Sequence, residues 1–111
     1  MEFYQGWGTW MRVLLTREDG SYEELDSTQR DAHEVLGGPV QIAGAIHELN
    51  VVAVGLREND ALISNPYCGD KDRFEDDVRG PVLFVASDVT GDEMDVNVNV
   101  LLEVLEIAPQ R

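Results

Sequence analysis

Cysteine, lysine and histidine are scarce in this sequence. Cys68 is the one cysteine, so the chain cannot form an internal disulfide, and the two histidines, His33 and His47, lie far from it in the sequence. Zinc sites need several cysteines or histidines at short spacing, so we expect no metal and no cofactor. No apolar run approaches the length of a membrane span, and no basic start precedes an apolar stretch as in a secretory signal. These absences favour a soluble, cytoplasmic protein.

Basic residues are also few. The chain of 111 residues has 22 acidic residues against 8 basic ones, which gives a net charge of −14, and Lys71 is its one lysine. This excess would repel nucleic acids and anionic membranes, so direct binding to either is not expected. Two explanations of the acidity stay open: it reflects coding bias or adaptation to salt, or it was selected for a basic partner.

The length fits one domain with one moderate core. From Met11 onward the sequence looks like the start of that domain, so we interpret residues 1–10 as an aromatic extension, residues 11–107 as a single α+β domain and residues 108–111 as a tail. The extension contains Trp7 and Trp10. These two side chains are candidate anchors for a second copy of the chain, or they pack onto the domain's own surface.

The first part of the domain predicts a hairpin and a short helix. The Asp19-Gly20 pair between alternating residues is a strong hairpin signal, so we expect strands at about 11–17 and 21–25. Asp26 or Ser27 can then cap a helix of about ten residues, with Gln29 completing a capping box, and the Gly37-Gly38-Pro39 run ends it.

The rest of the chain predicts apolar antiparallel strands and a terminal helix. The runs at 40–46 and 51–58 flank a polar break and indicate a second hairpin, with a shorter strand at 61–64 as a further candidate. Residues 82–87 are apolar on both faces, which predicts a central, fully buried strand. Residues 96–107 fit both a strand and a helix. We expect a helix in their second half, because the alternation decays after Val100 and Asp95 or Asn97 can act as a cap.

The stretch from 64 to 84 gathers Cys68, Lys71 and several acids, and therefore invites a search for chemistry. Asp70 and Asp72 have the spacing that opens an EF-hand loop, but Phe74 takes the third ligand position and no glycine follows it. Nothing around Cys68 resembles the local signatures of cysteine enzymes. No catalytic residue is assigned.

The acids of this stretch are more informative as charge. Carboxylates perform acid or base chemistry only in a cleft that shifts their pKa values, and exposed ones simply make a negative surface. We expect a solvated turn or short helix here. The candidate acidic face consists of Asp70, Asp72, Glu75, Asp76 and Asp77. A second acidic cluster consists of Glu23, Glu24 and Asp26.

Several short motifs together resemble a family of small proteins, a domain of unknown function that phages and mobile elements carry. The similar features are the Gly-Gly turn in LGGPV, the Asn65-Pro66 turn after an apolar strand, the strand RGPVLFVASD and the acidic Gly91-Asp92-Glu93 turn before a terminal helix. The resemblance covers about residues 11–107. It implies a phage-like accessory protein in the host cytoplasm, and it contributes no catalytic residues.

Three hypotheses of function follow. The first is a non-enzymatic binding module that meets a basic partner protein through its acidic surface, with a nucleic-acid mimic as its narrower form. The second is a small enzyme or ligand-binding domain with a pocket near Asn65, Tyr67, Cys68 and Arg79, in which Arg79 would hold an anionic group. The third is a structural protein that self-associates through Trp7 and Trp10.

Overall fold

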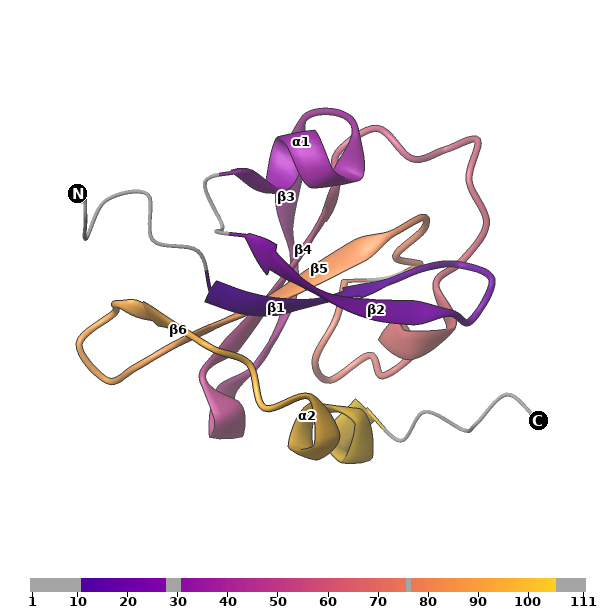
Figure 1. Ribbon diagram of the computed structural model, residues 1–111. Coiled ribbons are helices and arrows are strands. Elements are labelled where there is room, and N and C mark those ends of the chain that lie inside the picture. Colours follow the sequence, from indigo (N-terminus) through magenta and orange to yellow (C-terminus); the bar gives the residue numbers. More distant parts are fainter. Residues whose placement is uncertain (1–10, 28–30, 76, 106–111) are drawn as a thin grey trace.

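The computed structural model describes residues 11–27, 31–75 and 77–105 of the chain. These residues form one antiparallel sheet in the order β2-β1-β5-β4-β3, with β6 paired to β5 (Figure 1). The strands are β1 (Met11–Thr16), β2 (Tyr22–Ser27), β3 (Val40–Ile46), β4 (Val51–Leu56), β5 (Val82–Ser87) and β6 (Glu93–Met94). The helices are α1 (Ala32–Leu36) and α2 (Val98–Leu105), with 3-10 turns η2 (His47–Leu49) and η3 (Pro66–Cys68). The expected α+β domain is confirmed, and the sheet dominates it.

The central position of β5 follows from its composition. It pairs with β1 on one side and with β4 on the other, and its residues from Val82 to Ala86 are all buried. A strand that is covered on both faces has no need of polar alternation, which is why the run VLFVA is apolar throughout. The prediction of a central, buried strand at 82–87 is confirmed.

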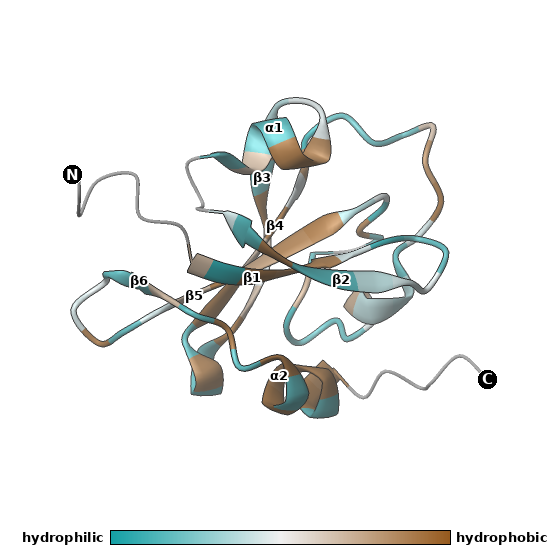
Figure 2. Cartoon of the chain, in the orientation of Figure 1, coloured by the Kyte–Doolittle hydropathy of each residue, from teal (hydrophilic) through white to brown (hydrophobic). Residues whose placement is uncertain are grey.

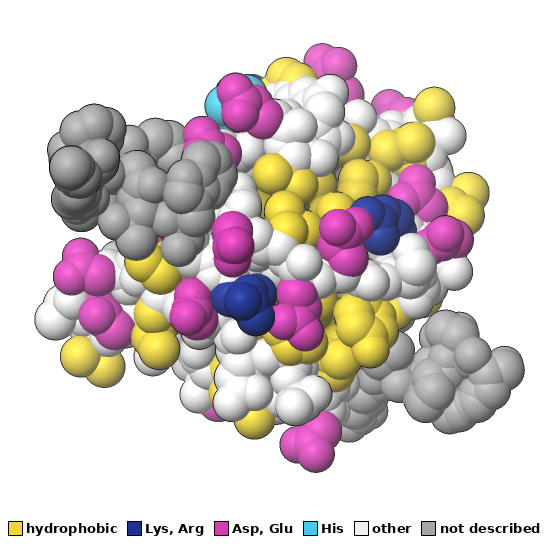
Figure 3. All heavy atoms as spheres, in the orientation of Figure 1, with side chains coloured by type: hydrophobic (Ala, Val, Ile, Leu, Met, Phe, Trp, Pro, Cys, Tyr) yellow, Lys and Arg dark blue, Asp and Glu magenta, His cyan; other side chains and the backbone are white. Residues whose placement is uncertain are grey.

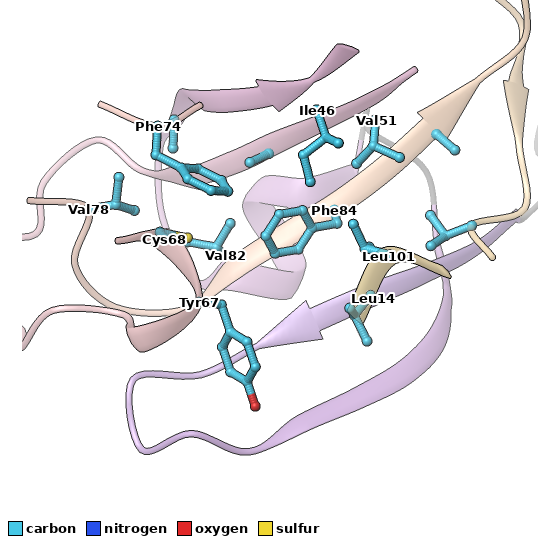
Figure 4. Packing of buried hydrophobic residues seen from close by; sticks show 14 residues of the cluster. Leu14, Ile46, Val51, Tyr67, Cys68, Phe74, Val78, Val82, Phe84 and Leu101 are labelled. Carbon is cyan, nitrogen blue, oxygen red and sulfur yellow. The ribbon is translucent and has the colours of Figure 1, made fainter. Parts of the chain in front are cut away.

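The two faces of the sheet carry separate apolar clusters. Figure 1 shows α1 on one side of the sheet and α2 on the other, and Figure 2 shows apolar residues concentrated in β5 and on both helices. Val13, Leu83 and Val85 pack under α1. The larger cluster on the opposite face surrounds Phe84 and Leu14 and is covered by α2 and by the chain around η3 (Figure 4).

The first hairpin forms where the sequence predicts it. Arg17 N donates to Ser21 O at 2.9 Å, Gly20 N donates to Arg17 O at 3.0 Å, and Gly20 has φ of +91°. This is a three-residue loop with a glycine in the left-handed conformation, for which glycine has no steric penalty. The Asp19-Gly20 signal therefore located the turn correctly.

The predicted helix start after the first hairpin is wrong. Asp26 and Ser27 remain in β2, paired with Arg12 and Met11, and Ser27 is fully buried. The helix α1 has five residues rather than about ten, and Asp31 at its start makes no side-chain capping bond. The ladder to β1 holds Asp26 in the strand, so its side chain is not available as a cap. Gln29, the expected partner of that cap, lies outside the described residues.

The second hairpin and the terminal helix are confirmed, whereas the candidate strand at 61–64 is wrong. Residues 60 and 61 form a turn, which Leu62 N closes by donating to Asn59 O at 2.9 Å, and Ser64 makes a single bridge to Arg79. The helix α2 begins at Val98, and Asn97 caps it by accepting a hydrogen bond of 3.3 Å from Val100 N on its side-chain oxygen. The alternative cap, Asp95, instead accepts from Arg12 N at 2.7 Å. The short strand β6 has no counterpart among the predictions.

Candidate functional site

The Asn-Pro turn at 65–66 is held by a buried side chain. Asn65 is 3% exposed, and its side-chain oxygen accepts from Tyr67 N at 2.9 Å, which shapes the 3-10 turn η3. Its side-chain nitrogen donates to Gly80 O at 2.8 Å and to Thr16 Oγ1 at 3.2 Å. These bonds join η3 to the start of β5 and to the end of β1. The contacts of Asn65 are those of a structural residue.

Tyr67 and Cys68, the other two residues of the candidate pocket in this turn, are buried members of the larger cluster. Figure 4 shows the Tyr67 ring directed toward the hairpin of β1 and β2. The Tyr67 hydroxyl donates to Gly20 O, and burial raises the pKa of this phenol. Cys68 is 5% exposed, and burial raises the pKa of its thiol to about 12. The nucleophilic form of cysteine is the thiolate, so a thiol with this pKa is a poor nucleophile at neutral pH.

Arg79, the fourth residue of the candidate pocket, lies at the surface. Its Nε donates to Asp77 Oδ2 at 2.7 Å, and its Nη1 donates to Asp60 O at 3.0 Å. The Asp77 side chain also accepts from Ser64 Oγ at 2.8 Å, and the bond from Arg79 is the largest cause of the lowered Asp77 pKa. The guanidinium therefore holds the loop before β5 in place, and its hydrogen bonds go to Asp77 and Asp60 rather than toward Cys68.

Two surface hollows have room for a small molecule, and neither collects the four candidate pocket residues. A hollow of about 290 Å³ between η3 and α2 includes Tyr67 in its wall, together with Asp70 and Arg73. Another of about 320 Å³ lies over the ends of β3 and β4, and includes Arg57 and Asp77 in its wall. No local motif predicts the second hollow, because its walls come from separate parts of the chain: β3, β4 with the residues after it, and Glu75, Asp77 and Val78.

The candidate acidic face is exposed and contains an arginine. Asp70, Asp72, Glu75 and Asp77 are all exposed, and Asp76 lies outside the described residues. Arg73 stands between them, 3.8 Å from Asp70 and 2.6 Å from Glu48 in η2. The guanidinium also donates to Val104 O in α2 at 3.2 Å. Arg73 therefore holds this segment against two other elements and offsets part of its negative charge.

The second acidic cluster lies along β2 beside two arginines of the neighbouring strand and turn. Arg12 lies 3.0 Å from Glu24 and 3.6 Å from Asp26, and Arg17 pairs with Glu23. The bond to Glu24 is the largest cause of the raised Arg12 pKa. Figure 3 shows this face of the molecule, with basic side chains bordered by acidic ones. Exposed pairs of this kind contribute little to folding stability.

Within 11–27, 31–75 and 77–105, no three histidine, cysteine or carboxylate side chains come close enough to hold a metal ion. Nor does any helix in these ranges have the length and apolar character that crossing a membrane requires. His33 lies in α1 and His47 in η2, and both are exposed.

Comparisons with other proteins give no family for this chain. No family model, no curated protein and no solved structure matches it. Trp7 and Trp10, the expected anchors for self-association, lie outside the described residues.

Proposed function

We propose that this chain is a non-enzymatic protein-binding module that meets a basic partner protein through its acidic surface. The observation that carries the proposal is the excess of 22 acids over 8 bases, with the acids of both predicted clusters exposed where the structure describes them. Charge of one sign speeds the encounter with a partner of the opposite sign and excludes partners of the same sign.

The arrangement of the charges favours a protein partner over mimicry of a nucleic acid. A mimic needs a continuous row of negative charge, because duplex DNA carries one charge per roughly 1.7 Å of its axis. Here Arg73 stands inside the segment 70–77, Arg79 pairs with Asp77, and Arg12 lies among the acids of β2. Arginines placed among the acids suit an interface that contains charges of both signs. In such an interface the positions of the charges select the partner.

The alternative functions have weaker support. Asn65, Cys68 and Arg79 are occupied by structural contacts, which disfavours a ligand pocket built from them. Self-association through Trp7 and Trp10 depends on residues outside the described ranges. The similarity to a phage-borne domain family, and with it an accessory role in the host cytoplasm, is part of the proposal and comes from the short motifs alone.

Affinity capture at two ionic strengths tests the proposal. We would compare the wild type with a triple variant of the candidate acidic face, Asp70→Asn, Asp72→Asn and Glu75→Gln. A matched control, Glu34→Gln, Glu58→Gln and Glu103→Gln, removes the same charge elsewhere. We expect a basic protein that is retained at about 0.01 M salt, is retained less at about 0.15 M, and binds the first variant more weakly than the matched control. A partner retained equally by all three proteins and at both salts would contradict the proposal.

A further inference from the structure

The strand β2 lies at an edge of the sheet. It pairs with β1 over six residues, and no other strand among the described residues pairs with it. The edge strand at the other end of the sheet, β3, is partly covered, because Ala45 N donates to Arg73 O at 3.0 Å and Glu75 N donates to Ala43 O at 2.8 Å. The long edge open to solvent in the described part of the chain is therefore β2.

The register of the hairpin tells which backbone groups of β2 face outward. Arg17 N donates to Ser21 O, so the pair formed by these residues is hydrogen-bonded. In an antiparallel ladder every second pair is of this kind, and the residues between direct their N–H and C=O groups to the opposite side. Glu23 and Leu25 therefore bond to β1. Tyr22, Glu24 and Asp26 present their backbone groups to solvent.

The side chains along this edge define its chemistry. Tyr22 is 48% exposed, and the side chains of Glu24 and Asp26 are 47% and 67% exposed. The hairpin from Met11 to Ser27 has five carboxylates and two guanidinium groups. An extended segment that carries lysine or arginine would satisfy the open backbone groups and meet the surplus of negative charge.

We propose that β2 is a docking edge, to which an extended basic segment of a partner protein adds as a further β strand. This inference rests on the proposed function and specifies the form of the partner. In strand addition the backbone hydrogen bonds supply the affinity, and the alternate side chains supply the specificity. Tyr22, whose ring makes an edge contact with Tyr67 at 6.4 Å, offers an aromatic surface for the stem of a basic side chain.

A second copy of the chain is a poor occupant of this edge. Antiparallel pairing of two β2 strands about Glu24 places the two Glu24 side chains directly opposite each other, and each Asp26 beside Tyr22 of the other copy. Like charges directly opposite each other destabilise a strand pair. The charge that attracts a basic segment thus protects the edge against self-pairing, as charges on natural edge strands commonly do.

Two synthetic peptides separate strand addition from simple charge attraction. The first is a peptide of about eight residues that alternates lysine and threonine, a length typical of a strand. The second has the same length and lysine content with proline in place of threonine, so it cannot donate the backbone bonds of a ladder. We expect the first peptide to bind the full chain at least about tenfold more tightly than the second.

Hydrogen exchange of the backbone amides shows which amides of β2 become hydrogen-bonded when the peptide binds. When the lysine–threonine peptide binds, the amides of Tyr22, Glu24 and Asp26 should become protected. The amides of Glu23 and Leu25 are already bonded to β1 and should change little. This alternation cannot come from charge attraction, which has no period of two.

A pair of substitutions at one position supplies the matched control. Glu24→Gln and Glu24→Pro remove the same charge, but only the proline removes the outward N–H. We expect the glutamine variant to bind the lysine–threonine peptide within about threefold of the wild type and the proline variant to bind about tenfold more weakly. Retained protection at Glu23 and Leu25 would show that the proline variant keeps the hairpin, and the two peptides test the wild type independently of it.

Three outcomes would overturn the inference. If both peptides bind equally and the alternating protection is absent, the binding is electrostatic, and the proposed function survives without strand addition. If neither peptide binds, strand addition at β2 fails, and affinity capture with the charge variants then decides the proposed function separately. If the same amides become protected as the protein concentration rises without peptide, a second copy occupies the edge.

Discussion

The side-chain nitrogen of Asn65 donates a hydrogen bond of 3.2 Å to the hydroxyl of Thr16, which lies 49 positions earlier in the chain. Thr16 Oγ1 in turn donates to Val82 O at 3.1 Å, so this buried chain of bonds joins η3, β1 and β5. Three parts of the fold are fixed by polar groups that have no access to water. Such groups are costly to leave without partners.

Asn65→Ala should therefore destabilise the fold strongly. It would leave Tyr67 N and Gly80 O without their buried partner, at a cost of about 2 to 3 kcal/mol. Chemical denaturation checks this value. The control is Asn59→Ala, which removes one bond of 2.9 Å to Leu56 O at a half-buried position and should cost about 1 kcal/mol. Equal losses for the two variants would contradict a structural role for Asn65.

Phe84→Ala should cost about 3 to 5 kcal/mol in free energy of unfolding. Phe84 is fully buried at the centre of the larger cluster and makes an edge contact with Phe74, with ring centroids 6.2 Å apart. Truncation leaves a cavity that the sheet on one side and α2 on the other cannot close. Val89→Ala, at a residue 92% exposed, should stay within about 0.5 kcal/mol. A denaturation midpoint that barely moves for Phe84→Ala would place this ring outside the core.

Gly44→Ala should destabilise the protein through a clash at the β3 edge. A methyl group at Gly44 would lie 2.4 Å from Arg73 O and 2.5 Å from the Phe74 ring, and the backbone at Arg73 has little room to move. We expect a loss of about 1 to 3 kcal/mol in denaturation and faster exchange of the Glu75 amide. Gly69→Ala meets nothing within 4 Å and should be close to neutral. A neutral Gly44→Ala would show that segment 73–75 is not held against β3.

The thiol of Cys68 should be unreactive in the folded protein. Burial raises its pKa to about 12, so the folded state contains almost no thiolate at neutral pH, and the thiolate is the reactive form. A maleimide should label Cys68 only as fast as the protein unfolds, and labelling should be complete in denaturant. Rapid labelling under native conditions would contradict the burial and reopen the enzyme hypothesis.

Added salt should stabilise the fold. With 22 acids against 8 bases, repulsion among the carboxylates outweighs attraction to the bases in the compact state. Dissolved ions screen that repulsion. We expect the melting temperature to rise by about 4 to 8 °C between about 0.01 M and about 0.15 M salt, equivalent to about 1 kcal/mol. The triple amide variant of Asp70, Asp72 and Glu75 should respond less. An unchanged melting temperature would show that the acids are too dispersed to affect stability.

Short sequence motifs predicted the elements that are fixed by contacts between residues close together in the chain. The glycine at position 20 and the Asn97 cap each act within a few residues, so the first hairpin turn and the start of α2 could be located from the sequence. The prediction of a helix cap at Asp26 was wrong although its side chain is suitable for a cap. Its partner in the ladder, Arg12, lies 14 positions away, and this long-range pairing overrides the local preference.

The sequence by itself determined the two hairpins, the central buried strand at 82–87 and the net charge. These follow from the type of each residue and from the spacing of the apolar ones. Only the tertiary structure decided that β2 is an open edge, that segment 73–75 covers β3, and that Arg73 and Arg79 lie among the acids. Strand order is set by which apolar faces pack together across long stretches of chain. A residue's neighbours across the sheet therefore cannot be inferred from its neighbours in the sequence.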